Sequence, residues 1–161
     1  MEILQLLNSG SAKLRDQHIL SHKLDSEILL SKVLKRKREK IIVDFDKKVS
    51  KKDIKHFERL IKRRSSHEPI AYILKKKEFW SKNFLVNKNV LIPRPETELM
   101  VEKIIKIFKS KEINILDIGT GTGCILLSIV GGIQKSRGIG IDISQEAIKI
   151  AVRNQNNHNL C

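Results

Sequence analysis

The stretch Ile115-Leu116-Asp117-Ile118-Gly119-Thr120-Gly121-Thr122-Gly123 decides the fold of the C-terminal part of this 161-residue chain. An apolar run of strand character ends in an acid, a loop of alternating glycines follows, and an apolar run typical of a helix begins at Cys124. Glycine accepts positive φ and lets a ligand approach the backbone, because it carries no Cβ. A loop at a helix N-terminus also offers free N–H groups to polar or anionic ligand groups. The stretch therefore predicts a ligand-binding turn between a strand and a helix.

A second acid lies at the end of the next predicted strand, residues 138–143. Asp142 follows Gly119 by 23 residues, the position from which an acid in a Rossmann-like βαβ unit reaches the ribose hydroxyls of a nucleoside cofactor. Dinucleotide sites have the spacing G-x-G-x-x-G, whereas here the spacing is G-x-G-x-G and Cys124 stands where the third glycine would fall. This tighter loop resembles the cofactor loop of S-adenosylmethionine-dependent methyltransferases. An ordinary βα turn is the alternative, and Asp142 argues against it.

The charge of the chain is strongly basic. Its 32 basic and 18 acidic residues give a formal net charge of +14, and the basic residues form clusters at 35–38, 62–64 and 75–77. Such clusters favour RNA or a ribosome-associated partner. A lysine-rich composition with solvated basic faces explains them equally well.

Several classes of protein are disfavoured. Cys124 and Cys161 are the only cysteines and have no metal-type spacing, so we expect no metal site and no disulfide framework, with Cys124 packing as a small apolar residue behind the loop. The first residues lack the basic region and cleavage pattern of a signal peptide. The longest apolar stretch, residues 124–133, is too short to span a bilayer. These features predict a cytoplasmic protein without a membrane segment.

From residue 1 to about residue 75 the apolar residues have helical spacing. Two amphipathic segments lie near residues 3–14 and 28–34, and a third, which begins near Ser50, has the clearest pattern. Ser50 and Asp53 resemble a capping box, and one apolar face follows, made of Ile54, Phe57, Leu60 and Ile61. No combination of residues here resembles a catalytic site, so we expect a helical bundle that presents a surface.

Residues 78–92 change to an alternating pattern, which predicts a β-hairpin with turns at 81–83 and 87–89. Pro93-Arg94-Pro95 leads into a helix, with Pro95 in its first turn. A strand at 113–118, a helix at 124–130, a strand at 138–143 and a helix at 145–154 complete the chain. The predicted fold class is α/β: an N-terminal helical bundle (1–75), a β-hairpin linker (76–92), and the first βαβα part of a Rossmann-like methyltransferase domain with an incomplete sheet (93–161).

Short motifs beyond the glycine loop narrow this class. They are Arg63-Arg64, Glu68 to Leu74, Glu78-Phe79-Trp80, Leu91 to Glu98, and Asp142-Ile143-Ser144 with Ala147. The run Ile92-Pro93-Arg94-Pro95-Glu96-Thr97-Glu98 discriminates best, because many methyltransferases share the glycine loop. Together they resemble the HemK/PrmC family, enzymes that methylate the glutamine of the Gly-Gly-Gln motif in peptide-chain release factors. Lys75 departs from the family pattern, which usually has glycine there.

The resemblance implies a helical domain that grips the release factor, a hairpin linker and a domain that binds S-adenosyl-L-methionine. It implies that the loop cradles the methionine end of the cofactor, through Gly119, Thr120, Gly121, Thr122 and Gly123, and that Asp142 holds the ribose. It also places a linker motif beside the cofactor pocket, in a positioning role, made of Arg94, Pro95, Glu96 and Thr97.

One family motif is absent from the sequence. Members carry Asn-Pro-Pro-Tyr after the fourth strand, where the asparagine and a backbone carbonyl align the substrate amide for in-line transfer, and this chain has no such tetrapeptide. We therefore assign no catalytic residue, and expect a C-terminally truncated chain that is inactive alone. An RNA or DNA methyltransferase and a non-catalytic binding fragment remain as alternatives.

Overall fold

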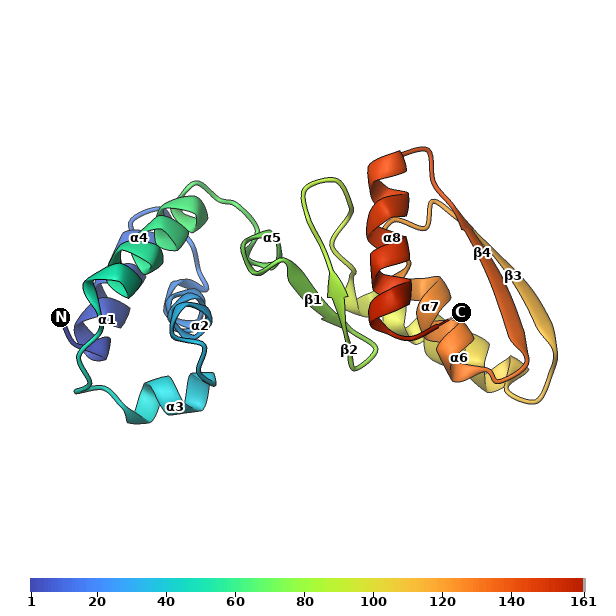
Figure 1. Ribbon diagram of the computed structural model, residues 1–161, viewed down its shortest axis with the longest axis horizontal. Coiled ribbons are helices and arrows are strands. Elements are labelled where there is room, and N and C mark those ends of the chain that lie inside the picture. Colours follow the sequence, from blue (N-terminus) through green and yellow to red (C-terminus); the bar gives the residue numbers. More distant parts are fainter. Residues whose placement is uncertain (161) are drawn as a thin grey trace. The chain divides into compact units, whose positions relative to one another are not determined.

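The computed structural model describes residues 1–160, and these form two compact units that divide between Leu74 and Lys75. The first unit is helical and the second combines a hairpin, a parallel pair of strands and three longer helices (Figure 1). The mixed α/β fold predicted from the sequence is confirmed. Each unit has its own apolar core.

The helical unit contains five helices: α1 (Ile3–Arg15), α2 (His22–Leu34), α3 (Arg38–Val43), α4 (Lys51–Ser65) and α5 (Ile70–Leu74). The three predicted amphipathic segments are α1, α2 and α4, and their apolar faces meet in one core. A Cβ on Gly10 would lie 2.7 Å from the Phe57 ring, so this glycine lets α1 approach α4. The short α3 was not predicted, since Ile41 is its one buried residue.

The Ser50 half of the capping box predicted at α4 is confirmed. The Ser50 hydroxyl accepts a hydrogen bond from the Asp53 N–H at 3.1 Å and donates to the Asp53 carboxylate at 2.7 Å. The cap satisfies one of the N–H groups that a helix start leaves free. It fixes where α4 begins and so which of its residues face outward.

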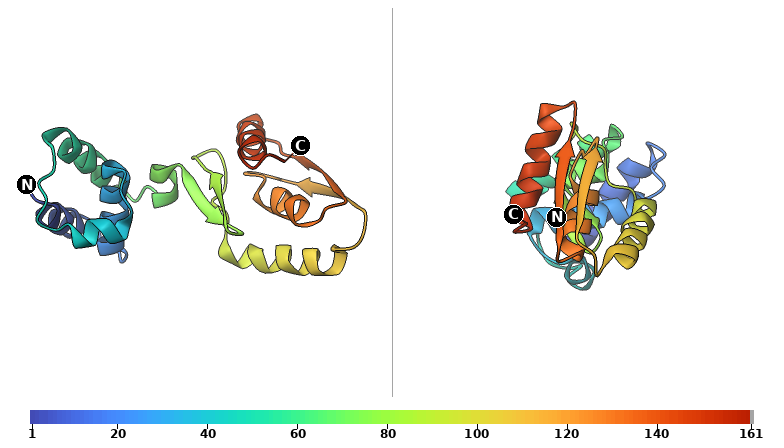
Figure 2. Two further views of the ribbon diagram at one scale, coloured as in Figure 1. Left: turned by 60° about the horizontal axis from the view of Figure 1, so that its bottom comes forward. Right: turned by 90° about the vertical axis from the view of Figure 1, so that its right-hand side faces the viewer.

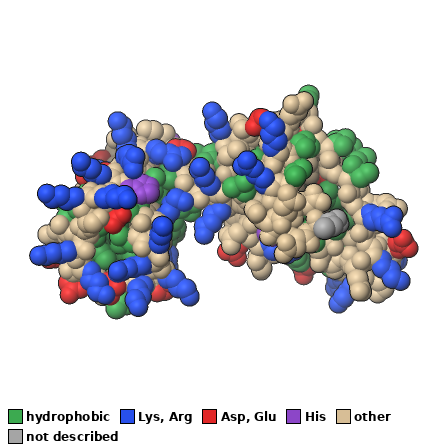
Figure 3. All heavy atoms as spheres, in the orientation of Figure 1, with side chains coloured by type: hydrophobic (Ala, Val, Ile, Leu, Met, Phe, Trp, Pro, Cys, Tyr) green, Lys and Arg blue, Asp and Glu red, His purple; other side chains and the backbone are tan. Residues whose placement is uncertain are grey.

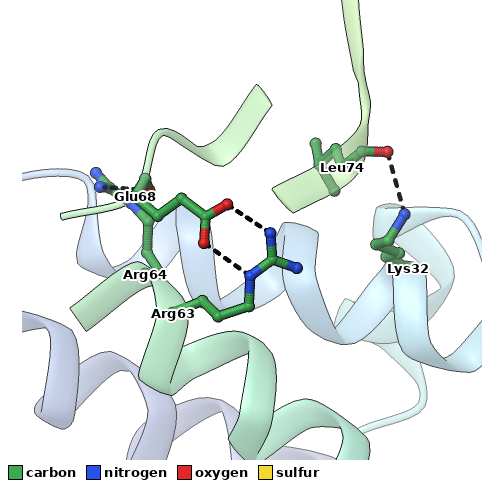
Figure 4. A network of polar contacts seen from close by, with 5 residues as sticks. All are labelled: Lys32, Arg63, Arg64, Glu68 and Leu74. Carbon is green, nitrogen blue, oxygen red and sulfur yellow. Dashed lines mark hydrogen bonds and ion pairs between the residues drawn. The ribbon is translucent and has the colours of Figure 1, made fainter. Parts of the chain in front are cut away.

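The motif at residues 63–74 forms the corner between α4 and α5 (Figure 4). Arg63 Nε donates to the Glu68 carboxylate at 2.7 Å, and this hydrogen bond lowers the pKa of Glu68. Arg64 Nε donates to the Asp25 carboxylate at 2.6 Å, and its Nη1 donates to the Glu68 carbonyl at 3.2 Å. Lys32 Nζ donates to the Leu74 carbonyl at 3.1 Å. These residues of the family-like motif therefore hold the helical unit together.

The second unit begins with an antiparallel hairpin of β1 (Lys76–Phe79) and β2 (Lys82–Leu85). Its two-residue turn is Trp80-Ser81, with φ of 52° and 55°. The predicted turn at 81–83 is wrong by one residue, and the predicted continuation of the alternating pattern as strand to Ile92 is also wrong. Positive φ at both turn residues matches the right-handed twist of a hairpin, so the chain turns earlier than its composition suggests. The turn places Phe79 and Phe84 in the core, with ring centroids 6.1 Å apart.

The rest of the unit runs η1 (Pro95–Thr97), α6 (Glu98–Phe108), β3 (Ile113–Ile118), α7 (Cys124–Gly132), β4 (Ser136–Ile141) and α8 (Gln145–Asn157). Strands β3 and β4 are parallel, in register from Ile113 opposite Ser136 to Ile118 opposite Ile141. Strand β4 begins and ends two residues earlier than predicted, so Asp142 lies just beyond its end.

The helices cover only one face of this parallel pair. In Figure 1, α6, α7 and α8 lie to the left of β3 and β4, and in the right-hand view of Figure 2, which looks onto the other face of the strands, no helix lies in front of them. Apolar side chains line the open face: Leu116, Ile118, Ile139 and Ile141 are all exposed. Inward, a Cβ on Gly138 would lie 2.5 Å from Leu126, so α7 packs directly on β4.

Candidate cofactor site

The glycine loop and the acid after β4 meet at one edge of the parallel pair. Because β3 and β4 run in the same direction and in register, their carboxyl ends lie side by side. The loop leaves β3 there, and the Gly121 N–H donates to the Asp142 carboxylate at 2.9 Å. Two sequence-predicted site elements are thus brought into direct contact. Ligands of open α/β sheets bind outside the carboxyl ends of the strands.

The three loop glycines have different surroundings. Their φ values are 80° at Gly119, 54° at Gly121 and 76° at Gly123, in the left-handed region. A Cβ on Gly119 would meet nothing within 4 Å, and one on Gly121 would come no closer than 3.9 Å to another atom. A Cβ on Gly123 would lie 3.1 Å from Leu127. The first two glycines therefore border open space that fits a ligand, whereas the third is needed for packing on α7.

The prediction that this loop offers free N–H groups is wrong for most of its residues. The N–H groups of Gly119 and Thr120 donate to the Ile141 carbonyl at 2.8 and 2.9 Å, and that of Gly123 donates to the Thr120 carbonyl at 2.8 Å. The Cys124 N–H donates to the Thr122 hydroxyl at 3.3 Å. The loop thus uses most of its donors to hold its own shape, which leaves the open surface above Gly119 and Gly121 for a ligand.

Asp142 braces the loop from the end of β4. Its carboxylate accepts from the Ser144 N–H and the Gly121 N–H, each at 2.9 Å. These two hydrogen bonds, the Ser144 one first, lower the pKa of Asp142, so the group is ionised at neutral pH. A carboxylate has about four acceptor positions. Two backbone donors therefore leave acceptor capacity for the hydroxyl groups of a ligand.

The two loop threonines face inward. Thr120 and Thr122 are buried, and the Thr120 hydroxyl donates to the Asp117 carboxylate at 2.8 Å. Cys124 packs in the apolar core behind the loop, as predicted, and burial raises the pKa of its thiol. These buried side chains support the loop on the side that faces the core.

Asn154 is the residue that sequence reasoning missed. It is fully buried in α8, where the sequence favours a polar helix end facing water. Its Oδ1 accepts from the Leu85 N–H at 2.6 Å, and its Nδ2 donates to the Leu85 carbonyl at 3.1 Å and to the Thr122 carbonyl at 2.9 Å. One amide thus joins α8, the hairpin and the glycine loop. Among sequence signals, only its helical spacing of four from the buried Ile150 could have indicated an inward position.

The linker motif lies at the start of α6. Pro95, Glu96 and Thr97 form the 3₁₀ turn η1, closed by a hydrogen bond from the Thr97 N–H to the Arg94 carbonyl at 3.1 Å. Arg94, Pro95 and Glu96 are exposed, and Thr97 is half-buried. The next residue, Glu98, accepts from the Trp80 N–H at 3.0 Å and so ties α6 to the hairpin turn. The motif is accessible, and Glu98 anchors it.

Two kinds of feature are absent from residues 1–160. No group of three or more His, Cys, Asp or Glu side chains gathers there as metal ligands would. None of the helices in that range is long and apolar enough to cross a membrane.

Comparison with known proteins assigns the two units separately. Residues 5–74 match the PrmC N-terminal domain, and residues 109–161 match a methyltransferase domain. A release factor glutamine methyltransferase from Buchnera aphidicola subsp. Acyrthosiphon pisum is 42% identical over 151 residues, which are 94% of this chain. One from Leptospira interrogans is 41% identical over 155 residues, also 94% of this chain. The chain belongs to the PrmC/HemK family.

The match covers nearly all of this chain but only part of each relative. The chain spans 54% of the Buchnera and Leptospira relatives. A bifunctional methyltransferase from Rickettsia typhi is 37% identical over 98% of this chain, which spans 34% of that protein. Within the family, the helical unit corresponds to the PrmC N-terminal domain, and the glycine loop and Asp142 fall within the methyltransferase match.

Proposed function

We propose that this chain supplies the cofactor loop and the helical recognition domain of an S-adenosyl-L-methionine-dependent methyltransferase that modifies the Gly-Gly-Gln glutamine of peptide-chain release factors. The observation that carries the proposal is the glycine loop braced by the ionised Asp142 at the carboxyl ends of β3 and β4. Family membership supports the substrate. When bound, the cofactor would supply the electrophilic methyl group.

The chain's own residues would bind and orient the cofactor. Gly119 and Gly121 leave room for its methionine end, and Asp142 has acceptor capacity for the ribose hydroxyls. Ile143, next to Asp142, is fully exposed and offers an apolar surface on which an adenine ring could pack. Arg94 to Thr97 would position substrate or cofactor without taking part in bond making.

The helical unit would hold the release factor, and methyl transfer would need a further group. An amide nitrogen is a poor nucleophile, so catalysis depends on aligning it with the sulfonium methyl. The family aligns it with Asn-Pro-Pro-Tyr, which this sequence lacks. We therefore propose that the 161-residue chain, tested alone, transfers no methyl group.

The cofactor assignment is tested by titrating the chain with S-adenosyl-L-methionine and following amide resonances by NMR, which detects weak binding. We expect the resonances of the loop, residues 119–123, to shift. Asp142→Ala should weaken binding by about tenfold to a hundredfold, because a charge-assisted hydrogen bond contributes roughly 1.5–3 kcal/mol. Glu146→Ala, which removes an exposed acid in the first turn of α8, should leave the affinity unchanged. Equal affinities for all three proteins would contradict the assignment.

The substrate assignment needs a separate assay. The chain is incubated with methyl-labelled cofactor, a release factor and total RNA, and the Gly-Gly-Gln peptide is analysed by mass spectrometry. We expect no methylation by the chain alone. A methylated Gly-Gly-Gln peptide would support the substrate and refute the inactivity, whereas label in RNA would favour an RNA methyltransferase.

A further inference from the structure

The basic residues of the helical unit fall into two groups, those with acidic partners and those without. In the cluster at 35–38, which the sequence emphasises, the two arginines have acidic partners. Arg36 and Lys47 both pair with the Asp44 carboxylate, at 3.1 and 3.0 Å, and Arg38 pairs with Glu27 at 3.7 Å. In the cluster at 62–64, Arg63 pairs with Glu68 and Arg64 with the buried Asp25. Clusters read from the sequence are therefore poor guides to free charge.

Exposed lysines elsewhere in the helical unit, such as Lys13 and Lys23, also form no ion pair within residues 1–160, but five such bases share one side of α4. Five exposed residues of α4 form no ion pair within residues 1–160, and we call them the basic stripe: Lys51, Lys52, Lys55, Arg59 and Lys62. At about 100° per residue, they fall within an arc of about 100° around the helix. The buried residues Phe57, Leu60 and Ile61 occupy the opposite side. Figure 3 shows how strongly Lys and Arg side chains gather over the helical unit.

The shape and chemistry of the basic stripe suit a polyanion. A shallow hollow of about 830 Å³ is lined by the five bases and by one acid, Glu58. From Lys51 to Lys62 the helix advances about 16 Å at 1.5 Å per residue, so its five positive charges have a mean spacing of about 4 Å along the axis. Along the axis of a DNA duplex, one strand carries a phosphate about every 3.4 Å. The basic stripe therefore carries charge of the opposite sign at a mean spacing of similar size.

The lining also distinguishes a duplex backbone from other polyanions. It contains no aromatic ring on which an unpaired base could stack, as sites for single strands usually do. It presents four ammonium groups, which bind phosphates as point charges, and one guanidinium, whose planar fork matches a phosphate. Contacts of both kinds to phosphates carry little sequence information. An acidic protein surface would need several carboxylates within the same stretch of about 16 Å.

We propose that the basic stripe on α4 binds the phosphate backbone of double-helical RNA, independently of its sequence. The choice of RNA rests on the proposed function, because release factors act on the ribosome; the choice of a phosphate backbone does not. The stripe would give the helical unit a second contact beside its protein substrate.

The test compares two triple variants of equal net charge in the full 161-residue chain. Lys52→Gln, Lys55→Gln and Arg59→Gln remove the centre of the basic stripe, and glutamine keeps a similar helix propensity. The control carries Lys103→Gln, Lys106→Gln and Lys109→Gln, three exposed lysines at the end of α6. Both are titrated against a fluorescent RNA duplex over a range of salt concentrations.

With five phosphate contacts, the slope of log affinity against log salt should be about −4.5 for the unmodified chain and about −2 for the stripe variant. At 0.1 M salt the stripe variant should lose two to three orders of magnitude in affinity, since each contact contributes about 0.9 of a decade there. The control should stay close to the unmodified chain. Glu58→Gln should bind the duplex more tightly, because it removes the one acid of the lining. Equal losses in both triple variants would overturn the proposal.

The source of the phosphate is decided in cells that express the chain. Ultraviolet crosslinking should yield a protein–nucleic acid adduct that ribonuclease removes and that the stripe variant lacks. An adduct removed by deoxyribonuclease would overturn the RNA assignment. Retention of the chain on immobilised polyglutamate but not on the RNA duplex would indicate an acidic protein partner and would also overturn it.

Discussion

Replacing Asn154 by alanine removes one buried amide and three hydrogen bonds. The Leu85 N–H, the Leu85 carbonyl and the Thr122 carbonyl all lose their partner. A hydrogen bond contributes about 1 kcal/mol net, and a buried group left unpaired costs about 1–3 kcal/mol. We expect the second unit to lose about 3 kcal/mol of unfolding free energy, a large part of the stability of an ordinary domain.

The single tryptophan of the chain provides the assay. Trp80 lies in the hairpin turn of the second unit, so its fluorescence in a urea titration follows that unit and not the helical one. The matched control is Asn157→Ala, which changes the same residue type at the exposed last position of α8. A surface substitution of this kind should cost less than about 0.5 kcal/mol.

Asn154→Asp separates the hydrogen bonds from the packing. An aspartate has nearly the same shape and keeps the acceptor for the Leu85 N–H, but it loses both donated bonds and buries a charge. We expect it to be at least as destabilising as alanine. The reasoning would be refuted if Asn154→Ala and Asn157→Ala unfolded at the same urea concentration.

Three further changes have definite expected outcomes. Arg64→Ala removes the ion-pair partner of the buried Asp25 carboxylate and should lower the unfolding free energy of the helical unit by about 3–5 kcal/mol. The neighbouring Arg63→Ala breaks the partly exposed pair with Glu68 and should lower it by about 1 kcal/mol or less. Thermal melting followed by far-ultraviolet circular dichroism measures both. Burial, aided by the charge of Lys82, lowers the pKa of His158. The unfolded chain therefore binds more protons, so stability should fall as pH drops through about 6.5, and His158→Phe should remove that dependence in urea titrations at several pH values. Gly123→Ala forces a Cβ to 3.1 Å from a leucine of α7 at a φ of 76°; it should destabilise the second unit in the Trp80 assay, and an unchanged midpoint would contradict the packing role of this glycine.

Local signals predicted the elements whose determinants are close in sequence. The Ser50 cap and the apolar face behind it fixed α4, and the apolar run before the glycines fixed β3 at 113–118. The sequence predicts β4 two residues too late, because Ser136 and Arg137 are polar and the alternating isoleucines continue to Ile143, past the paired segment. The hairpin turn was misplaced because Trp80 and Ser81 are not residues that favour positive φ.

The remaining features depend on contacts between distant parts of the chain. Asn154 lies 69 residues from Leu85, and Arg64 lies 39 residues from Asp25, so no window of sequence contains either pair. In the same way, the N–H groups of Gly119 and Thr120 are not free, because they donate to the Ile141 carbonyl of the neighbouring strand. Sequence indicates which residues are polar or basic, but only the fold determines which of them find partners.

The uncovered face of β3 and β4 has a consequence for the colloidal behaviour of the chain. Its isoleucines and leucine invite self-association, as do the free edges of a two-stranded sheet. The net charge of +14 opposes association by repulsion between molecules. Salt shortens the range of that repulsion to about 10 Å at 0.1 M. Concentrated solutions should therefore stay clear at low ionic strength and become turbid as salt is added.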